Sequence, residues 1–122
     1  MRSVVITIAA ISVIGISQAK ANGVFAFMSG NDLLRACAAT DSYSQGTCYG
    51  YLEGVLDFQT QVRQASKLDS CLPEGIDGAK IKDAVVQFLR AHSAIRSYPA
   101  GALVTTAMGA KWACPSKPRN SN

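Results

Sequence analysis

The sequence predicts an all-α fold: a small four-helix bundle-like domain stapled by two disulfides, after a cleaved signal peptide. Apolar residues recur at steps of three and four in four segments, whereas no segment alternates apolar and polar residues as a strand does. The chain also contains four cysteines behind an N-terminal segment that has the features of an export signal: Cys37, Cys48, Cys71 and Cys114. An even number of cysteines in an exported chain indicates disulfides rather than thiols or metal ligands.

The export signal is read from the first 21 residues. Arg2 supplies a positive start, 4–16 is a mostly apolar stretch, and Ala19-Lys20-Ala21 has the small-x-small pattern that signal peptidase cuts. The alternative is an uncleaved anchor, but 13 helical residues span roughly 20 Å, short of the ~30 Å hydrocarbon core. We therefore expect a periplasmic protein that keeps no stable membrane anchor after cleavage.

Removal of residues 1–21 leaves a length typical of one small domain. Within it we expect an N-terminal extension at 22–28, a disulfide-stapled helical domain at 29–114 and a flexible polar tail at 115–122. The remaining sequence contains ten basic and eight acidic residues. This charge is too small and too dispersed for a nucleic-acid partner.

The first two helices are predicted from their starts. Ser29 and Asp32 have the spacing of a capping box and begin a short helix. Ser42 and Gln45 repeat that spacing at the start of a longer helix, whose apolar face continues to about Ser66.

Gly50 and Gly54 lie four residues apart on this longer helix. Each glycine lowers helix stability by about 1 kcal/mol relative to alanine. In an exported soluble domain such a pair usually lets another backbone come close, so we predict a helix-packing role for both.

The last two helices follow a connection at 68–78 that is rich in Pro and Gly. Asp77 can cap the third helix, and its buried stripe is predicted to contain Ile81, Val85, Phe88, Leu89 and His92. Residues 93–98 turn the chain. Pro99 fits the first position of the fourth helix, which carries an apolar face and ends near Ala113.

This helix order makes a prediction about the cysteines. In an up-and-down bundle, Cys37 and Cys48 meet at one pole, and Cys71 and Cys114 meet at the other. These pairs need the least backbone movement to bring their Cα atoms within bridging distance. Orthogonal helix packing would favour another connectivity.

The sequence predicts a protein that is not an enzyme. Four paired cysteines leave no free thiol, and His92, the single histidine, falls at the end of a helix, where capping is the expected role. The cysteine spacings contain no Cys-x-x-Cys metal knuckle, and phosphate-loop and haem-attachment motifs are absent. We expect no cofactor, no metal and a protein that works by binding.

Ordered motifs along the mature chain resemble the Rap/Tai family of periplasmic immunity proteins, which protect bacteria from peptidoglycan amidase effectors of type VI secretion. The most specific is Cys48-x-Gly50-Tyr51-x-x-Gly54. The others are Leu33-Leu34-x-x-Cys37, Cys71-x-Pro73-x-Gly75, Val85-Val86-x-Phe88-Leu89-x-x-His92, Ala102-Leu103-Val104 and Ala113-Cys114-Pro115. Ser93 stands where a proline is expected.

The resemblance implies an all-α protein, often a homodimer, that covers or plugs the active site of its effector with a loop between the last helices. On this chain the loop is 93–98, and its candidate contacts are Ser93, Arg96 and Tyr98. Two other functions stay open from the residues alone. One is a periplasmic acid-stress chaperone of the HdeA type, and the other is an orphan envelope binding protein with the same fold.

Overall fold

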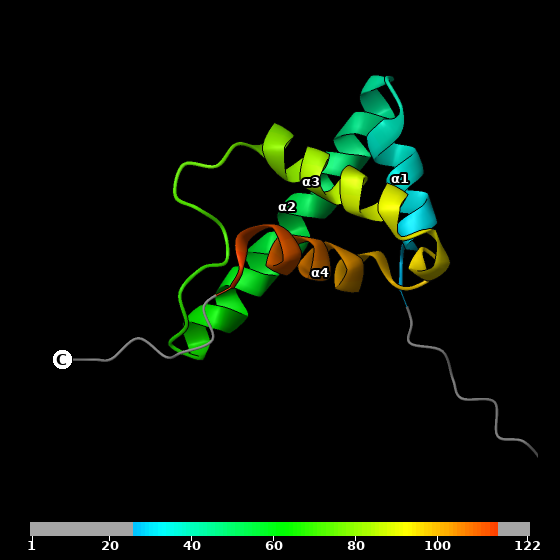
Figure 1. The fold of residues 1–122 in the computed structure, drawn as a ribbon. Coiled ribbons are helices and arrows are strands. Elements are labelled where there is room, and N and C mark those ends of the chain that lie inside the picture. The colour runs from blue at the N-terminus through cyan, green and yellow to red at the C-terminus, as the bar shows by residue number, and fades with distance from the viewer. Residues whose placement is uncertain (1–25, 115–122) are drawn as a thin grey trace, which may run out of the picture.

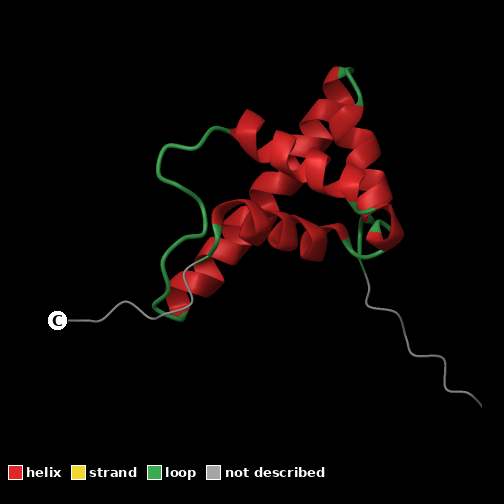
Figure 2. Cartoon of the chain, in the orientation of Figure 1, coloured by secondary structure: helices red, strands yellow, loops and turns green. Residues whose placement is uncertain are grey.

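The computed structural model describes residues 26–114, and the predicted signal peptide and tail lie outside this range. Its elements, in chain order, are α1 (Gly30–Ala38), α2 (Ser42–Ala65), α3 (Gly78–Ala91), the short 3-10 helix η1 (Ser93–Ile95) and α4 (Ala100–Trp112). No strand occurs among the described residues (Figure 2), although Ser29 and Pro99 form an isolated antiparallel bridge. The predicted all-α fold with four helices is confirmed.

Helix α2 is the longest element and the others pack around it. Figure 1 shows α1 beside its first half, and α3 and α4 running antiparallel to each other as they cross it. Every pair of the four helices is in contact. Within the described part of the chain, no helix is long and apolar enough to cross a membrane.

Two predicted helix starts are confirmed. Ser29 and Asp32 form a complete capping box at α1, in which each side chain bonds the other residue's backbone N–H. The Asp77 side chain accepts a 2.8 Å hydrogen bond from the backbone N–H of Lys80 at α3. Both acids lie where the positive end of the helix dipole favours a negative charge.

The predicted start of α2 was wrong by one residue. Asp41 is the N-cap and accepts a 2.9 Å bond from the backbone N–H of Ser44, while Ser42 is already helical. Aspartate one position earlier offers a charged acceptor, so it takes the capping position. The amide of Gln45 instead donates to the carbonyls of Cys37 and Ala39 at the end of α1.

Pro99 also differs by one position, because it is the N-cap of α4 and the helix begins at Ala100. The predicted end near Ala113 is confirmed, with Ala113 as a left-handed C-cap. His92, predicted in the buried stripe of α3, is exposed. The helix ends at Ala91, and His92 as C-cap leaves the helical path before its side chain can turn inward.

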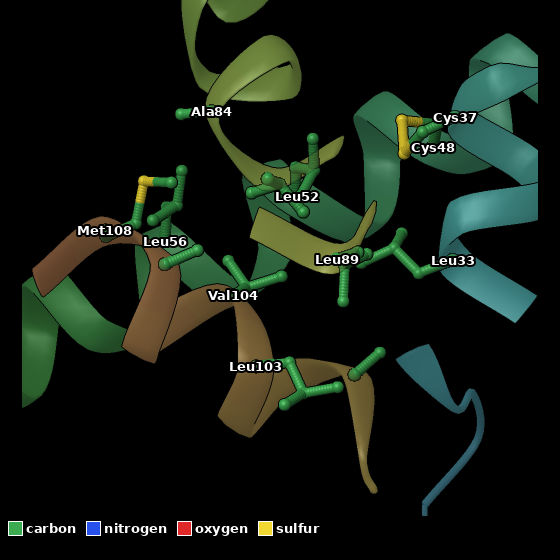
Figure 3. Packing of buried hydrophobic residues seen from close by; sticks show 13 residues of the cluster. Leu33, Cys37, Cys48, Leu52, Leu56, Ala84, Leu89, Leu103, Val104 and Met108 are labelled. Atoms are coloured by element: carbon green, nitrogen blue, oxygen red, sulfur yellow. A yellow bond between two sulfur atoms is a disulfide. The ribbon is translucent and has the colours of Figure 1, made fainter. Parts of the chain in front are cut away.

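One apolar core joins the four helices (Figure 3). The largest side chains in it are removed from solvent almost completely: Leu33, Leu52, Val85, Leu89, Val104 and Met108. They come from all four helices, so no helix can bury its apolar face without the other three. The predicted inner face of α4 lies in this core.

Two disulfides join different parts of the fold. Cys37, at the end of α1, is bonded to Cys48 in α2 with their Cα atoms 4.9 Å apart. Cys71, in the connection before α3, is bonded to Cys114 just after α4 with their Cα atoms 4.4 Å apart. These are the pairs that the hairpin topology predicts. The cysteines of the second disulfide are 43 residues apart in the sequence, whereas those of the first are 11 residues apart.

Candidate partner-binding site

The chain between α3 and α4, the 93–98 loop, is folded by its own hydrogen bonds. The backbone N–H of Ile95 donates to the carbonyl of His92, and that of Tyr98 donates to the carbonyl of Ile95, at 3.3 and 3.0 Å. The side chain of Ile95 packs against the core. The loop is therefore a fixed turn rather than an open connection.

The N-terminus of α1 holds this loop from the other side. The backbone N–H groups of Gly30 and Asn31 donate to the carbonyls of Tyr98 and Arg96, at 3.0 and 2.9 Å respectively. The N–H of Ala100 donates to the carbonyl of Met28 at 2.9 Å. The first N–H groups of a helix lack partners inside it, so the loop carbonyls satisfy them.

Gly30 makes this close contact feasible. A Cβ at position 30 would lie 2.9 Å from the Arg96 carbonyl oxygen and would collide with a methyl group of Leu103. The sequence showed Gly30 only as the residue between a cap and its helix. Its role depends on a contact with residues 66 positions later, which no local pattern reveals.

Most side chains of the loop are exposed to solvent. Ser93 and Ser97 are exposed, and the Tyr98 side chain is 59% exposed although it is large and aromatic. Arg96 is half-buried, and its Nε is buried with no hydrogen-bond partner among the described residues. Of the three predicted contact residues, Ser93 and Tyr98 are thus exposed, and Arg96 is only partly exposed.

His92 closes α3 as the sequence predicted. Its Nδ1 lies 2.7 Å from the carbonyl oxygen of Phe88, a contact in which the ring nitrogen must be the donor. The imidazole also stacks on the Phe88 ring with centroids 4.2 Å apart. Among the described residues, no group of three or more His, Cys, Asp or Glu side chains could hold a metal ion.

A second surface feature is an open apolar groove of about 980 Å³ between α2 and α4. It is lined by small residues of both helices, Gly50, Gly54, Gly101 and Ala102, and by the larger apolar residues Phe27, Phe58 and Val62. The large side chains are exposed, Phe27 to 92% and Phe58 to 68%. We call this feature the apolar groove.

The predicted packing role of Gly50 and Gly54 is not fulfilled inside the domain. A Cβ built on either glycine meets no atom within 4 Å. Both lie on an open face of α2, so no described part of the chain needs the space they leave. The sequence identified the pair but not the direction in which it faces.

The sequence profile of the Rap1a immunity proteins matches residues 29–114. The chain belongs to this family. The match begins at the Ser29 cap and ends at Cys114, so it covers the four helices, both disulfides and the 93–98 loop. Membership of the Rap1a family implies an immunity protein that binds a secreted effector and inhibits it without catalysis of its own. No curated protein and no solved structure matches the chain.

Next to the loop, the Rap1a-family fold holds a carboxylate with a lowered pKa. The Ser29 hydroxyl and backbone N–H both donate to Asp32, at 2.6 and 3.1 Å, and Arg35 pairs with it. The Ser29 hydroxyl, then its N–H, and then the Arg35 charge lower the pKa of Asp32 below its ordinary value of 3.8. Hydrogen bonds from Ser44 lower the pKa of Asp41 in the same direction.

We expect Asp32 and Asp41 to stabilise the fold above about pH 4 and to lose this effect as the pH falls below it. A carboxylate whose pKa is lower in the folded chain stabilises the fold above its unfolded pKa and loses this effect as the pH falls through the folded one. Asp32→Asn should therefore lower Tm by a few degrees at pH 7 and flatten the acid fall, measured by circular dichroism. Asp83→Asn, at an exposed site without a cap, is the control. An unchanged acid fall in Asp32→Asn would contradict this assignment.

Proposed function

We propose that this protein is a periplasmic immunity protein against a peptidoglycan amidase effector of type VI secretion. It binds the effector and covers or plugs its active site with the 93–98 loop. The observation that carries the proposal is the double anchoring of this loop, by its own turn and by the N-terminus of α1. Family membership supports the immunity role, and the resemblance of the sequence motifs supports the amidase target.

The physical reason is the low entropic cost of binding through a preformed loop. A flexible loop must be ordered when its partner binds, which subtracts from the affinity. Here the carbonyls of Arg96 and Tyr98 are already bonded to α1. The interaction energy of the side chains at the tip is then available for the partner.

The side chains of the loop suit this role. Tyrosine and arginine are the residue types that most often anchor protein interfaces. Tyr98 presents an exposed ring, and Arg96 has a buried Nε without a described partner. The exposed phenol of Tyr98 and the exposed part of Arg96 can hydrogen-bond to the walls of a polar catalytic cleft.

Export completes the proposal. Peptidoglycan lies outside the cytoplasm, so an inhibitor of its hydrolysis must be exported to meet the effector. The predicted signal peptide at residues 1–21 provides this route. A homodimer, which the resemblance implies, stays a prediction, and light scattering of the purified mature chain measures it.

The test of the loop is the double substitution Arg96→Ala with Tyr98→Ala. Loss of two anchor side chains should weaken binding to the purified cognate amidase effector by on the order of 100-fold, measured by calorimetry. Tyr43→Ala with Lys111→Ala removes an exposed tyrosine and an exposed cation elsewhere, so it should bind as the wild type does. Equal affinities of the wild type and the loop variant would remove the loop from the interface.

A further inference from the structure

A polar pocket of about 460 Å³ lies between the start of α3 and the end of α4. Its walls are residues 73–76 of the connection after α2, one face of α3 and the last turn of α4, which carries Trp112. Because α3 and α4 run antiparallel, these two helix ends lie together and away from the 93–98 loop (Figure 1). Small-molecule sites have volumes of about 300–1,000 Å³. We call this feature the Trp112 pocket.

A disulfide holds two walls of the pocket together. Cys71 lies two residues before the 73–76 wall, and Cys114 lies two residues after Trp112. The bond between these cysteines keeps their Cα atoms 4.4 Å apart. Trp112 is half-buried and packs against the apolar core. The pocket is therefore formed without a ligand, and a preformed site lowers the cost of binding.

Charged side chains of both signs line the pocket without touching one another. Glu74 and Asp83 supply two exposed carboxylates, and Lys111 supplies an exposed ammonium group. None of these three side chains forms a hydrogen bond or an ion pair within the described part of the chain. A second ammonium group, that of Lys80, pairs with Asp77 at 3.7 Å. The pocket thus offers both a negative and a positive partner to a molecule that lies in it.

This lining selects a ligand with three features. Glu74 and Asp83 can accept hydrogen bonds from an ammonium group, and Lys111 can donate to a carboxylate. The indole of Trp112 and the half-buried Ile76 offer apolar surface to a side chain. A free amino acid or a short peptide carries all three features. A segment inside a protein chain lacks both terminal charges, and a neutral sugar carries no charge.

We infer that the Trp112 pocket binds a short zwitterionic peptide with an apolar side chain. The ammonium group of the peptide lies toward Glu74 and Asp83, and its carboxylate lies toward Lys111. This inference does not rest on the proposed function. The 93–98 loop joins the opposite ends of α3 and α4, so a peptide in the pocket leaves the loop accessible to a protein partner.

The first test uses the tryptophan of the pocket as its readout. Trp112 is the single tryptophan of the chain, so the tryptophan fluorescence reports on this pocket alone. Titration with the dipeptide alanyl-leucine should shift the emission to shorter wavelength and reach saturation, because the ligand displaces water from the indole. N-acetyl-alanyl-leucine amide, which has the same side chains and no charge, should bind about tenfold more weakly or worse. Equal binding of the two compounds, or no emission change at millimolar dipeptide, would overturn the inference.

The second test concerns the partner of the ammonium group. In Glu74→Gln with Asp83→Asn, the affinity for alanyl-leucine should fall by about tenfold. N-acetyl-alanyl-leucine, which keeps only the carboxylate, should then bind as well as the free dipeptide. Both substitutions are close in shape and lie at exposed positions, so the fold should be kept, which circular dichroism checks.

The matched control is Glu53→Gln with Asp57→Asn. It removes two exposed carboxylates of α2 that do not line the pocket, so it should bind alanyl-leucine as the wild type does. An undiminished preference for the free amine in the pocket variant would show that Glu74 and Asp83 do not hold the ammonium group. An equal loss of affinity in the control variant would show that the effect does not come from the pocket.

Discussion

Replacement of Cys71 and Cys114 by alanine is expected to lower the free energy of unfolding by about 4 kcal/mol, the chain-entropy value for a loop of this length. The bond closes 43 residues of chain and ties the connection after α2 to the end of α4. Removal of a native disulfide from a small secreted domain often abolishes folding at 37 °C, so the variant should be close to unfolded at that temperature.

Urea unfolding monitored by circular dichroism measures this loss. The comparison is Cys37→Ala with Cys48→Ala, which opens an 11-residue loop and should lose about 3 kcal/mol. Non-reducing peptide mapping of the wild type checks the premise. A peptide that joins Cys37 to Cys71 or to Cys114 would contradict the assigned pairs.

Gly30→Ala is expected to destabilise the domain by about 1–3 kcal/mol, the usual range for an overpacked position. The added methyl would press on the backbone oxygen of Arg96, which cannot rotate away as a side chain can. Relief requires the 93–98 loop to move from α1 and to lose the hydrogen bonds that fix it. Effector affinity should therefore fall together with stability.

Gly46→Ala is the control for this effect. A methyl group there meets no neighbour, and the replacement of an exposed helical glycine should raise stability by up to about 1 kcal/mol. The two variants are compared by urea unfolding and by calorimetry with the effector. If Gly30→Ala is as stable as the wild type and binds as well, the loop does not depend on its contact with α1.

The helix starts that the sequence predicted correctly have local signals. Ser29 with Asp32 and Asp77 mark helix starts because the capping acceptor and the N–H groups that it serves are neighbours in the chain. The error at the start of α2 is also local. Asp41 and Ser42 are adjacent and are both good N-cap residues, so only the backbone conformation shows that Asp41 is the cap and that the helix begins at Ser42.

The features that the sequence did not predict depend on contacts between distant residues. The fit of Gly30 against Arg96 joins the two ends of the domain, and the direction of Gly50 and Gly54 depends on where α4 crosses α2. His92 was placed in the core because its spacing continued the stripe of α3, but the helix ends one residue earlier. Periodicity predicts a face only as far as the helix continues.

The most direct test of the proposed function is the survival of cells that direct the cognate amidase effector to their own periplasm. The account predicts that co-expression of the full-length chain prevents lysis and that a chain without residues 1–21 does not, because it stays away from the effector. Lysis that the full-length chain leaves unchanged would contradict the immunity role. Equal protection by the chain without residues 1–21 would contradict the periplasmic site of action.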